Sequence, residues 1–195
     1  MNKCIYLGLN CIAITDHNTI QGAIAVKDLA PFTVIIGEEI STAGGDLVGL
    51  FLEEEVPSGL TALETVRRIK DQGGLVSIPH PFDRLRSSVI SPEALEDILP
   101  HTDIIEVFNA RNISKKADER ALELARIHGV TGTAVSDAHT LMELGQTFAT
   151  LSGFDGSSQG FLDSLRQGTL TKSRSSPLVH LFTLYNKLTK RLLKR

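Results

Sequence analysis

The chain has 195 residues and a formal net charge of −3. At about 150 residues per domain, this length predicts one domain with at most a small appendage. Hydrophobic residues make up 42% and charged residues 22%, which is near the average for globular proteins and excludes wholesale disorder. The small net charge gives the chain no overall attraction to nucleic acid or to a membrane surface.

The cysteine content and the apolar runs exclude further classes. With only Cys4 and Cys11, the chain is neither a disulfide-rich secreted scaffold nor able to build a zinc knuckle from cysteines alone. No apolar run approaches the ~18 residues that a membrane-spanning helix needs. The first residues lack the features of a signal peptide. We therefore expect a cytoplasmic protein.

Short apolar runs rich in β-formers alternate with helical segments along most of the chain. Residues 4–10 look like the last turns of a helix that leads into a strand. The apolar runs are continuous rather than alternating, which is typical of strands covered on both faces in a parallel sheet. The candidate strands span residues 11–15, 33–37, 47–52, 75–79, 104–108 and 131–135.

Two segments between these strands carry apolar residues at helical spacing. In residues 61–72, Thr61 and Glu64 can form a capping box, and Gly73 can end the helix. Residues 112–128 form the second helix, and Gly129 follows it. The alternation of strands and helices predicts an α/β fold, either a barrel or an open doubly wound sheet.

Residues able to bind metals follow the predicted strands. In parallel α/β proteins the carboxyl ends of the strands meet at one rim, where ligands bind. Imidazole and carboxylate ligands together suit Zn, Mn or Fe, so we expect a hydrolytic metal site at this rim. The candidate ligands are Asp16, His17, Glu38, Glu39, His80, Asp137 and His139, and the polar residues Asn109 and Arg111 follow the fifth predicted strand.

These strand-end motifs, in this order, resemble those of the PHP (polymerase and histidinol phosphatase) family. The resemblance covers residues 7–168, and the most similar members are stand-alone metal-dependent phosphoesterases. It implies a distorted (β/α)7 TIM-like barrel with up to three divalent metals. The motifs are Ile14-Thr15-Asp16-His17-Asn18, Gly37-Glu38-Glu39-Ile40, Pro79-His80-Pro81-Phe82, Glu106-Val107-Phe108-Asn109-Ala110-Arg111 and Ser136-Asp137-Ala138-His139.

The resemblance also implies a set of metal ligands. Glu39 resembles the carboxylate that bridges two metals, with Glu38 as the spacer before it. His80 resembles a ligand of the second metal and Asp137 a ligand of the first, while His17 and His139 resemble ligands of the third. Among these, Glu39, Asp137 and His139 are the expected catalytic residues.

Three further positions surround this expected set. Asp16 resembles a residue that orients a ligand or its loop. Asp46 stands where many relatives have a histidine, so its role as a metal ligand is open. For the substrate, Arg111 with Arg84 or Arg86 is a candidate phosphate clamp, together with Asn109, because a guanidinium can bind phosphate bidentately. The alternative is that these arginines are solvated surface residues.

The larger departure from the family is an absence: the chain contains no His-x-His motif, which family members carry on their first strand. We therefore expect residues 1–172 to form a barrel without its first βα unit. Such a chain is expected to hold fewer metals and to have impaired activity. Residues 173–195 are expected to form a linker and a basic amphipathic helix, packed on the barrel or, alternatively, bound to an anionic membrane or RNA.

The predicted function is hydrolysis of a small phosphate ester, such as a nucleotide, by metal-activated water. Two alternatives stay open. One is a regulatory remnant that binds metal without turnover, and the other is an adaptor that acts through the basic C-terminal segment.

Overall fold

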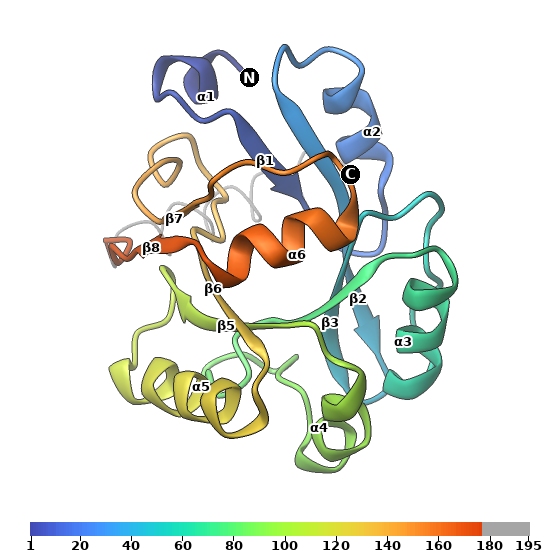
Figure 1. The fold of residues 1–195 in the computed structure, drawn as a ribbon. Coiled ribbons are helices and arrows are strands. Elements are labelled where there is room, and N and C mark those ends of the chain that lie inside the picture. Colours follow the sequence, from blue (N-terminus) through green and yellow to red (C-terminus); the bar gives the residue numbers. More distant parts are fainter. Residues whose placement is uncertain (177–195) are drawn as a thin grey trace, which may run out of the picture.

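The computed structural model describes residues 1–176, so the predicted C-terminal helix lies outside the described residues from position 177 on. A curled six-stranded sheet forms a half-barrel, and helices cover its outer face (Figure 1). In chain order the elements are α1 (Asn2–Tyr6), β1 (Cys11–Ile14), α2 (Gln21–Lys27), β2 (Thr33–Thr42), β3 (Gly45–Leu50), α3 (Ala62–Asp71), β4 (Leu75–Ile78), α4 (Pro92–Ile98), a 3-10 helix (Leu99–His101), β5 (Ile104–Asn109), α5 (Lys115–His128), β6 (Thr131–Val135), β7 (Phe148–Thr150), α6 (Ser158–Arg166) and β8 (Thr169–Thr171).

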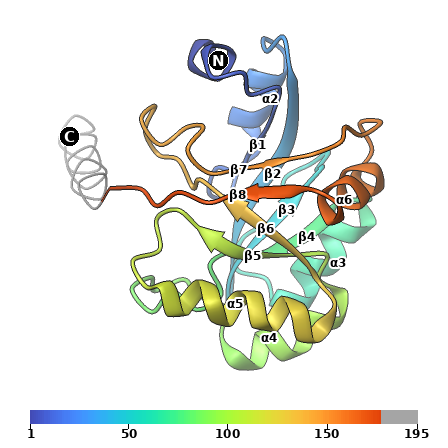
Figure 2. The ribbon, with the colours of Figure 1, turned by 60° about the vertical axis from the view of Figure 1, so that its left-hand side comes forward.

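The strands of the main sheet follow the chain in order from β1 to β6, while β7 and β8 form a separate antiparallel pair (Figure 2). β1 and β2 are parallel, as are β4, β5 and β6. β3 runs antiparallel to both of its neighbours. The expectation of a parallel sheet is therefore wrong for β3. Only Ala43 and Gly44 separate it from β2, whereas a parallel crossover needs a dozen or more residues.

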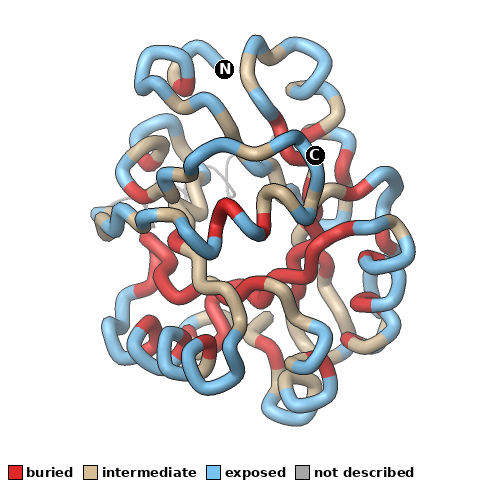
Figure 3. Tube along the Cα trace, in the orientation of Figure 1, coloured by how far each residue is buried: buried red, intermediate tan, exposed pale blue. Residues whose placement is uncertain are grey.

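The central strands β4 and β5 are covered on both faces, as their continuous hydrophobicity predicts. Neighbouring residues of one strand join different core clusters: Val76 lies in the cluster with α3, α4 and α5, and Leu75 in the cluster with α6. Ile105 and Ile104 divide in the same way on β5. The buried positions in Figure 3 follow this central sheet. Core packing therefore holds the middle of the sheet, and the polar side chains lie at the strand ends.

The helix ends follow from their capping residues. α3 begins after Thr61, whose side chain accepts a hydrogen bond from the Glu64 amide at 3.2 Å, and Gly73 follows it with φ +71°. α5 ends at Gly129, as predicted, but begins at Lys115 rather than at 112. Asn112 instead lies in a turn, where its side chain donates to Asp118 at 2.8 Å. Among residues 1–176, no helix is both long and apolar enough to cross a membrane.

Candidate metal centre

The loop after β1 continues alongside β2, and this places His17 next to Glu39. The Glu39 amide donates to the carbonyl of Asp16 at 3.1 Å, and the Asn18 amide donates to the carbonyl of Glu39 at 3.0 Å. These bonds make an isolated parallel bridge between His17 and Glu39. His17 Nε2 consequently lies 3.6 Å from Glu39 Oε2.

Asp46 joins this pair from β3. The hairpin places Asp46 opposite Ser41, two residues beyond Glu39, and its side chain is almost completely buried. Potential ligand atoms of His17, Glu39 and Asp46 all lie within 4.8 Å of one another. Two ligands of one transition metal are separated by up to about 4 Å, so small side-chain movements would let these three bind a single ion. One imidazole and two carboxylates fit a divalent metal such as Zn, Mn or Fe.

His80 reaches the same carboxylate from the other side. It follows β4 with φ +30°, its amide donates to Glu106 Oε2 at 3.0 Å, and its Nε2 lies 3.4 Å from Glu39 Oε1. The residue is 2% exposed, yet its Nδ1 has no hydrogen-bond partner among the described residues. Burial alone would lower the pKa of His80, but Glu39 and Glu106 outweigh it and raise the pKa. A buried, incompletely satisfied imidazole beside a carboxylate fits a metal-binding role.

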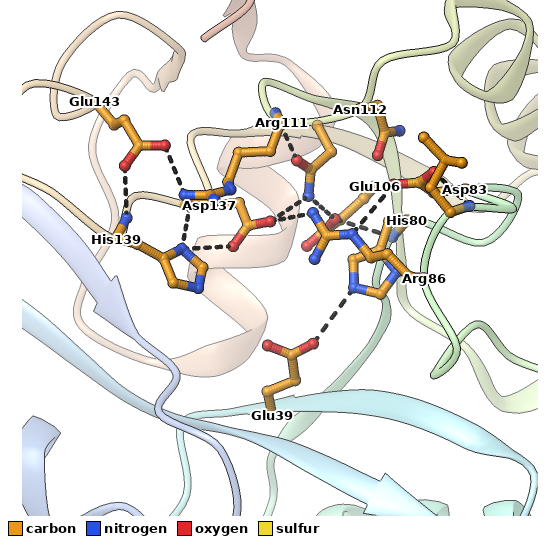
Figure 4. Close-up of polar contacts among 12 residues, drawn as sticks. Glu39, His80, Asp83, Arg86, Glu106, Arg111, Asn112, Asp137, His139 and Glu143 are labelled. Atoms are coloured by element: carbon orange, nitrogen blue, oxygen red, sulfur yellow. Dashed lines mark hydrogen bonds and ion pairs between the residues drawn. The ribbon is translucent and has the colours of Figure 1, made fainter. Parts of the chain in front are cut away.

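Asp137 and His139 come from the segment that follows β6. Asp137 has φ +46°, and its Oδ1 lies 3.5 Å from His139 Nδ1. Its other oxygen accepts from Arg86 at 2.5 Å and from Asn109 at 3.3 Å. Burial would raise the pKa of Asp137, but the positive charge of Arg86 outweighs it and lowers the pKa. In Figure 4 these side chains and His80 face Glu39 across one polar region.

The arginines expected at the phosphate occupy three different environments. Arg84 is exposed on the loop after β4. Arg86, on the same loop, points into the centre and contacts Asp137 and Asp83. The Arg111 side chain is only 6% exposed and pairs with Glu143 at 2.8 Å. Arg111 is therefore buried against Glu143, whereas the half-buried Arg86 contacts Asp137, one of the expected metal ligands.

Two other predicted residues have supporting positions. Asn109 is 1% exposed, and its side chain donates to Glu106 and Asp137, so it holds these carboxylates rather than reaching toward solvent. Asp16 is exposed, and its carbonyl accepts the Glu39 amide. Its carboxylate lies against the start of α2, so close that an added Cβ on Gly22 would be 2.2 Å from it.

Two carboxylates of the centre received no role from the sequence. Glu106 accepts hydrogen bonds from the His80 amide and from Asn109, and burial raises its pKa. Its signal in the sequence is a carboxylate within the apolar strand Ile104–Asn109, because charged side chains are rarely buried unless they are paired. Glu143 is 2% exposed, but it lies in an irregular segment whose sequence carries no comparable signal.

Comparison with known proteins gives results of three kinds. A family model described as PHP-associated matches residues 115–170. Two uncharacterized proteins of Methanocaldococcus jannaschii are similar in sequence: MJ1587 is 44% identical over 108 residues, covering 53% of this chain and 60% of that protein. MJ0417 is 37% identical over 177 residues, covering 85% of this chain and 71% of that protein.

A solved structure shares the fold. It is a two-domain protein of Bacteroides vulgatus that contains a predicted PHP-like metal-dependent phosphoesterase. It aligns with a TM-score of 0.68 and 18% identity over 88% of this chain and 60% of that one. The present chain therefore spans about 60% of the length of both MJ1587 and this structure.

Proposed function

Because the chain belongs to the PHP domain family, we propose that it provides the metal centre of a phosphoesterase that hydrolyses a small phosphate ester. The observation that carries this proposal is the convergence of His17, Glu39 and Asp46 within 4.8 Å. These three residues come from three successive segments of the sheet, and His80 contacts the same Glu39 from a fourth. The structural likeness to the Bacteroides vulgatus protein supports the fold that this centre requires.

His17, Glu39, Asp46 and His80 would hold one part of the metal centre, and Asp137 with His139 would hold the other. When bound, a divalent metal such as Zn, Mn or Fe supplies Lewis acidity, which makes water a competent nucleophile near neutral pH and offsets charge on the phosphoryl group. Glu39 faces both His17 and His80, so its two oxygens suit a bridging position. In the family this centre holds up to three metals, and the number here stays a prediction.

Arg86 is the residue that we propose for substrate phosphate. Its guanidinium lies beside Asp137, on a loop that also supplies His80, and its side chain is 24% exposed. A guanidinium can donate two parallel hydrogen bonds to phosphate. Arg86 can do so while Asp83 continues to hold its Nε, at 3.2 Å in the structure.

The finer fold prediction, a distorted (β/α)7 barrel that lacks its first βα unit, stays a prediction. Within residues 1–176, β1 pairs with β2 alone. The strand that carries His-x-His in the family would, by resemblance, complete the sheet beside β1.

The proposal is tested by metal content and phosphate release together. The protein is stripped of metal, reloaded with Mn²⁺, Zn²⁺ or Fe²⁺, and assayed on p-nitrophenyl phosphate and on nucleoside monophosphates. Glu39→Gln removes the shared carboxylate charge, so we expect a loss of bound metal and of most phosphate release. Glu54→Gln is the matched control, because Glu54 is exposed and its side chain makes no polar contact among the described residues.

Two results would redirect the proposal. Stoichiometric metal without phosphate release from any substrate would favour a protein that binds metal in a regulatory role. Absence of metal from both the wild type and Glu54→Gln would contradict the metal centre itself.

A further inference from the structure

A buried ion pair joins two loops behind the candidate metal centre. Arg111 follows β5 and Glu143 lies in the segment after β6, and their side chains are 6% and 1% exposed. Arg111 Nη1 donates to Glu143 Oε1 at 2.8 Å (Figure 4). Neither residue belongs to the set of expected metal ligands, so this pair needs a different explanation.

The second oxygen of Glu143 holds the segment that carries His139. Glu143 Oε2 accepts a hydrogen bond from the His139 amide at 3.0 Å and another from the Thr140 hydroxyl at 3.0 Å. A single carboxylate therefore binds both Arg111 and the backbone of an expected ligand.

Arg111 connects the same pair to Asp137. The Arg111 amide donates to Asn109 Oδ1 at 2.9 Å, and the amide group of Asn109 donates to Asp137 at 3.3 Å. The contacts form one continuous path from Glu143 through Arg111 and Asn109 to Asp137. Both residues expected to bind metal after β6 are thus attached to the end of β5.

Burial of two charges is costly, and a buried ion pair is often no more stabilising than two apolar side chains of similar size. A contribution to stability alone therefore explains this pair poorly. Groups that hold metal ligands in place, by contrast, commonly affect metal affinity by 10–100-fold. The contacts to the His139 amide and to Asn109 are of this second kind.

We propose that Arg111 and Glu143 are a positioning pair, which fixes residues 137–140 so that Asp137 and His139 can face a metal together. This inference rests on the proposed metal centre. It replaces the phosphate-binding role expected for Arg111, since its guanidinium is buried and paired with Glu143.

The test removes both charges at once, because a single substitution would leave an unpaired charge buried. The double variant Arg111→Met with Glu143→Leu is expected to fold, with a thermal midpoint close to that of the wild type. In the metal-free protein, hydrogen exchange at the His139 amide should accelerate by about tenfold or more because its acceptor is lost. Affinity for Mn²⁺, measured by titration calorimetry, should fall by about 10–100-fold.

An exposed ion pair provides the matched control. Arg126 and Glu123 lie on the surface of α5, where they pair at 2.8 Å with exposed side chains. Arg126→Gln with Glu123→Gln should leave both the His139 exchange rate and the Mn²⁺ affinity unchanged. The control separates loss of this particular pair from a general loss of surface charge.

If the double variant does not fold, a second variant still tests the proposal. Glu143→Asp retains the buried charge but shortens the side chain by one methylene, so it cannot reach Arg111 and the His139 amide together. For Glu143→Asp we expect faster exchange at the His139 amide and weaker Mn²⁺ binding, with a smaller loss of affinity than in the double variant. Wild-type exchange and Mn²⁺ affinity in a folded double variant, or in Glu143→Asp, would overturn the positioning role.

The outcome also distinguishes this inference from the proposed function. If the wild type binds no Mn²⁺, the metal centre fails, and with it the role toward a metal. If the wild type binds Mn²⁺ and the folded variants bind it equally well, only the positioning pair fails.

Discussion

At the scale of single residues, two of the candidate ligands, His80 and Asp137, share an unusual backbone conformation. His80 and Asp137 each follow a strand directly or nearly so, and they have φ values of +30° and +46°. Such conformations cost on the order of 1–3 kcal/mol for residues other than glycine, and they cluster at functional sites. Here the His80 amide bonded to Glu106 and the Asp137 carboxylate bonded to Arg86 hold them in place. The left-handed turn directs each side chain into the centre.

His80→Asn tests whether this side chain binds metal rather than supports the fold. Asparagine tolerates positive φ better than most residues, so the metal-free variant should melt within a few degrees of the wild type. Bound metal, measured by mass spectrometry, should fall markedly because the imidazole is lost. His128→Asn, at the exposed end of α5, is the control and should change neither quantity. Unchanged metal content in His80→Asn would reject its assignment as a ligand.

Glu55 should make the stability near the start of α2 depend on pH. Its Oε1 accepts hydrogen bonds from the Thr19 hydroxyl at 2.7 Å, from Gln21 Nε2 at 3.3 Å and from the Ile20 amide at 3.3 Å. These bonds lower its pKa from the usual 4.5. A carboxyl group with a lowered pKa in the folded state stabilises the protein above its unfolded pKa, and loses this contribution as the pH falls through the folded pKa.

The variant Glu55→Gln checks this dependence by thermal melts of the metal-free protein from pH 7 to pH 3. The wild type should be the more stable at pH 7, and the difference should shrink steadily below the usual pKa of 4.5. Glu54→Gln, without such bonds among the described residues, should show no such trend. A difference that grows toward acidic pH would have the opposite sign and would contradict the assignment.

At the scale of helices and strands, apolar runs predicted where the main strands lie, most clearly for β3, β4 and β5, whose residues are largely buried. The direction of a strand in the sheet was harder to predict than its position along the chain. β3 looks like any other apolar strand, and only the two-residue connection Ala43-Gly44 indicates that it turns back on β2. The start of α5 was also misplaced, because the side chain of Asn112 bonds to Asp118 and keeps the segment before Lys115 in a turn. Local side-chain bonds of this kind are not visible in a hydrophobic pattern.

The N-cap of α3 is an element whose contribution can be measured directly. Thr61→Ala removes the acceptor for the Glu64 amide, and we expect it to lower the free energy of unfolding by about 1 kcal/mol. Thr61→Ser keeps the hydroxyl, so it should lower the free energy of unfolding by no more than about half as much. Urea denaturation of both variants gives the comparison. Equal losses in the two would show that the hydroxyl bond is not the source of the effect.

At the scale of the whole molecule, the centre is assembled by the sheet. Its residues lie on or just after β1, β2, β3, β4 and β6, and three core clusters pack these strands together, the third of them through Ala134 of β6. The rule that parallel strands end at one rim predicts that these residues converge, and His17 and His80 both lie beside Glu39. Placing Asp46 beside His17 required the direction of β3, and the burial of Arg111 required the partner Glu143. Both depend on contacts between segments far apart in the chain.

Because the ligands come from so many strands, metal binding should stabilise the entire fold and not only one loop. A ligand that binds the folded state stabilises it by about 2.7 kcal/mol at a concentration one hundred times its Kd. For a domain of this size, that corresponds to a rise of about 5–10 °C in the melting temperature. Mn²⁺ or Zn²⁺ added to the stripped protein should therefore raise the midpoint, and EDTA should reverse the rise.

The variant Glu39→Gln separates this effect from binding elsewhere on the surface. Glu39 faces His17 on one side and His80 on the other, so its loss weakens contacts to ligands from two further segments. The melting temperature of the metal-free Glu39→Gln variant should stay near that of the wild type, whereas its rise on adding metal should largely vanish. Glu54→Gln should keep the full rise, since Glu54 lies outside the centre. An equal rise in Glu39→Gln and the wild type would place the stabilising metal elsewhere in the molecule.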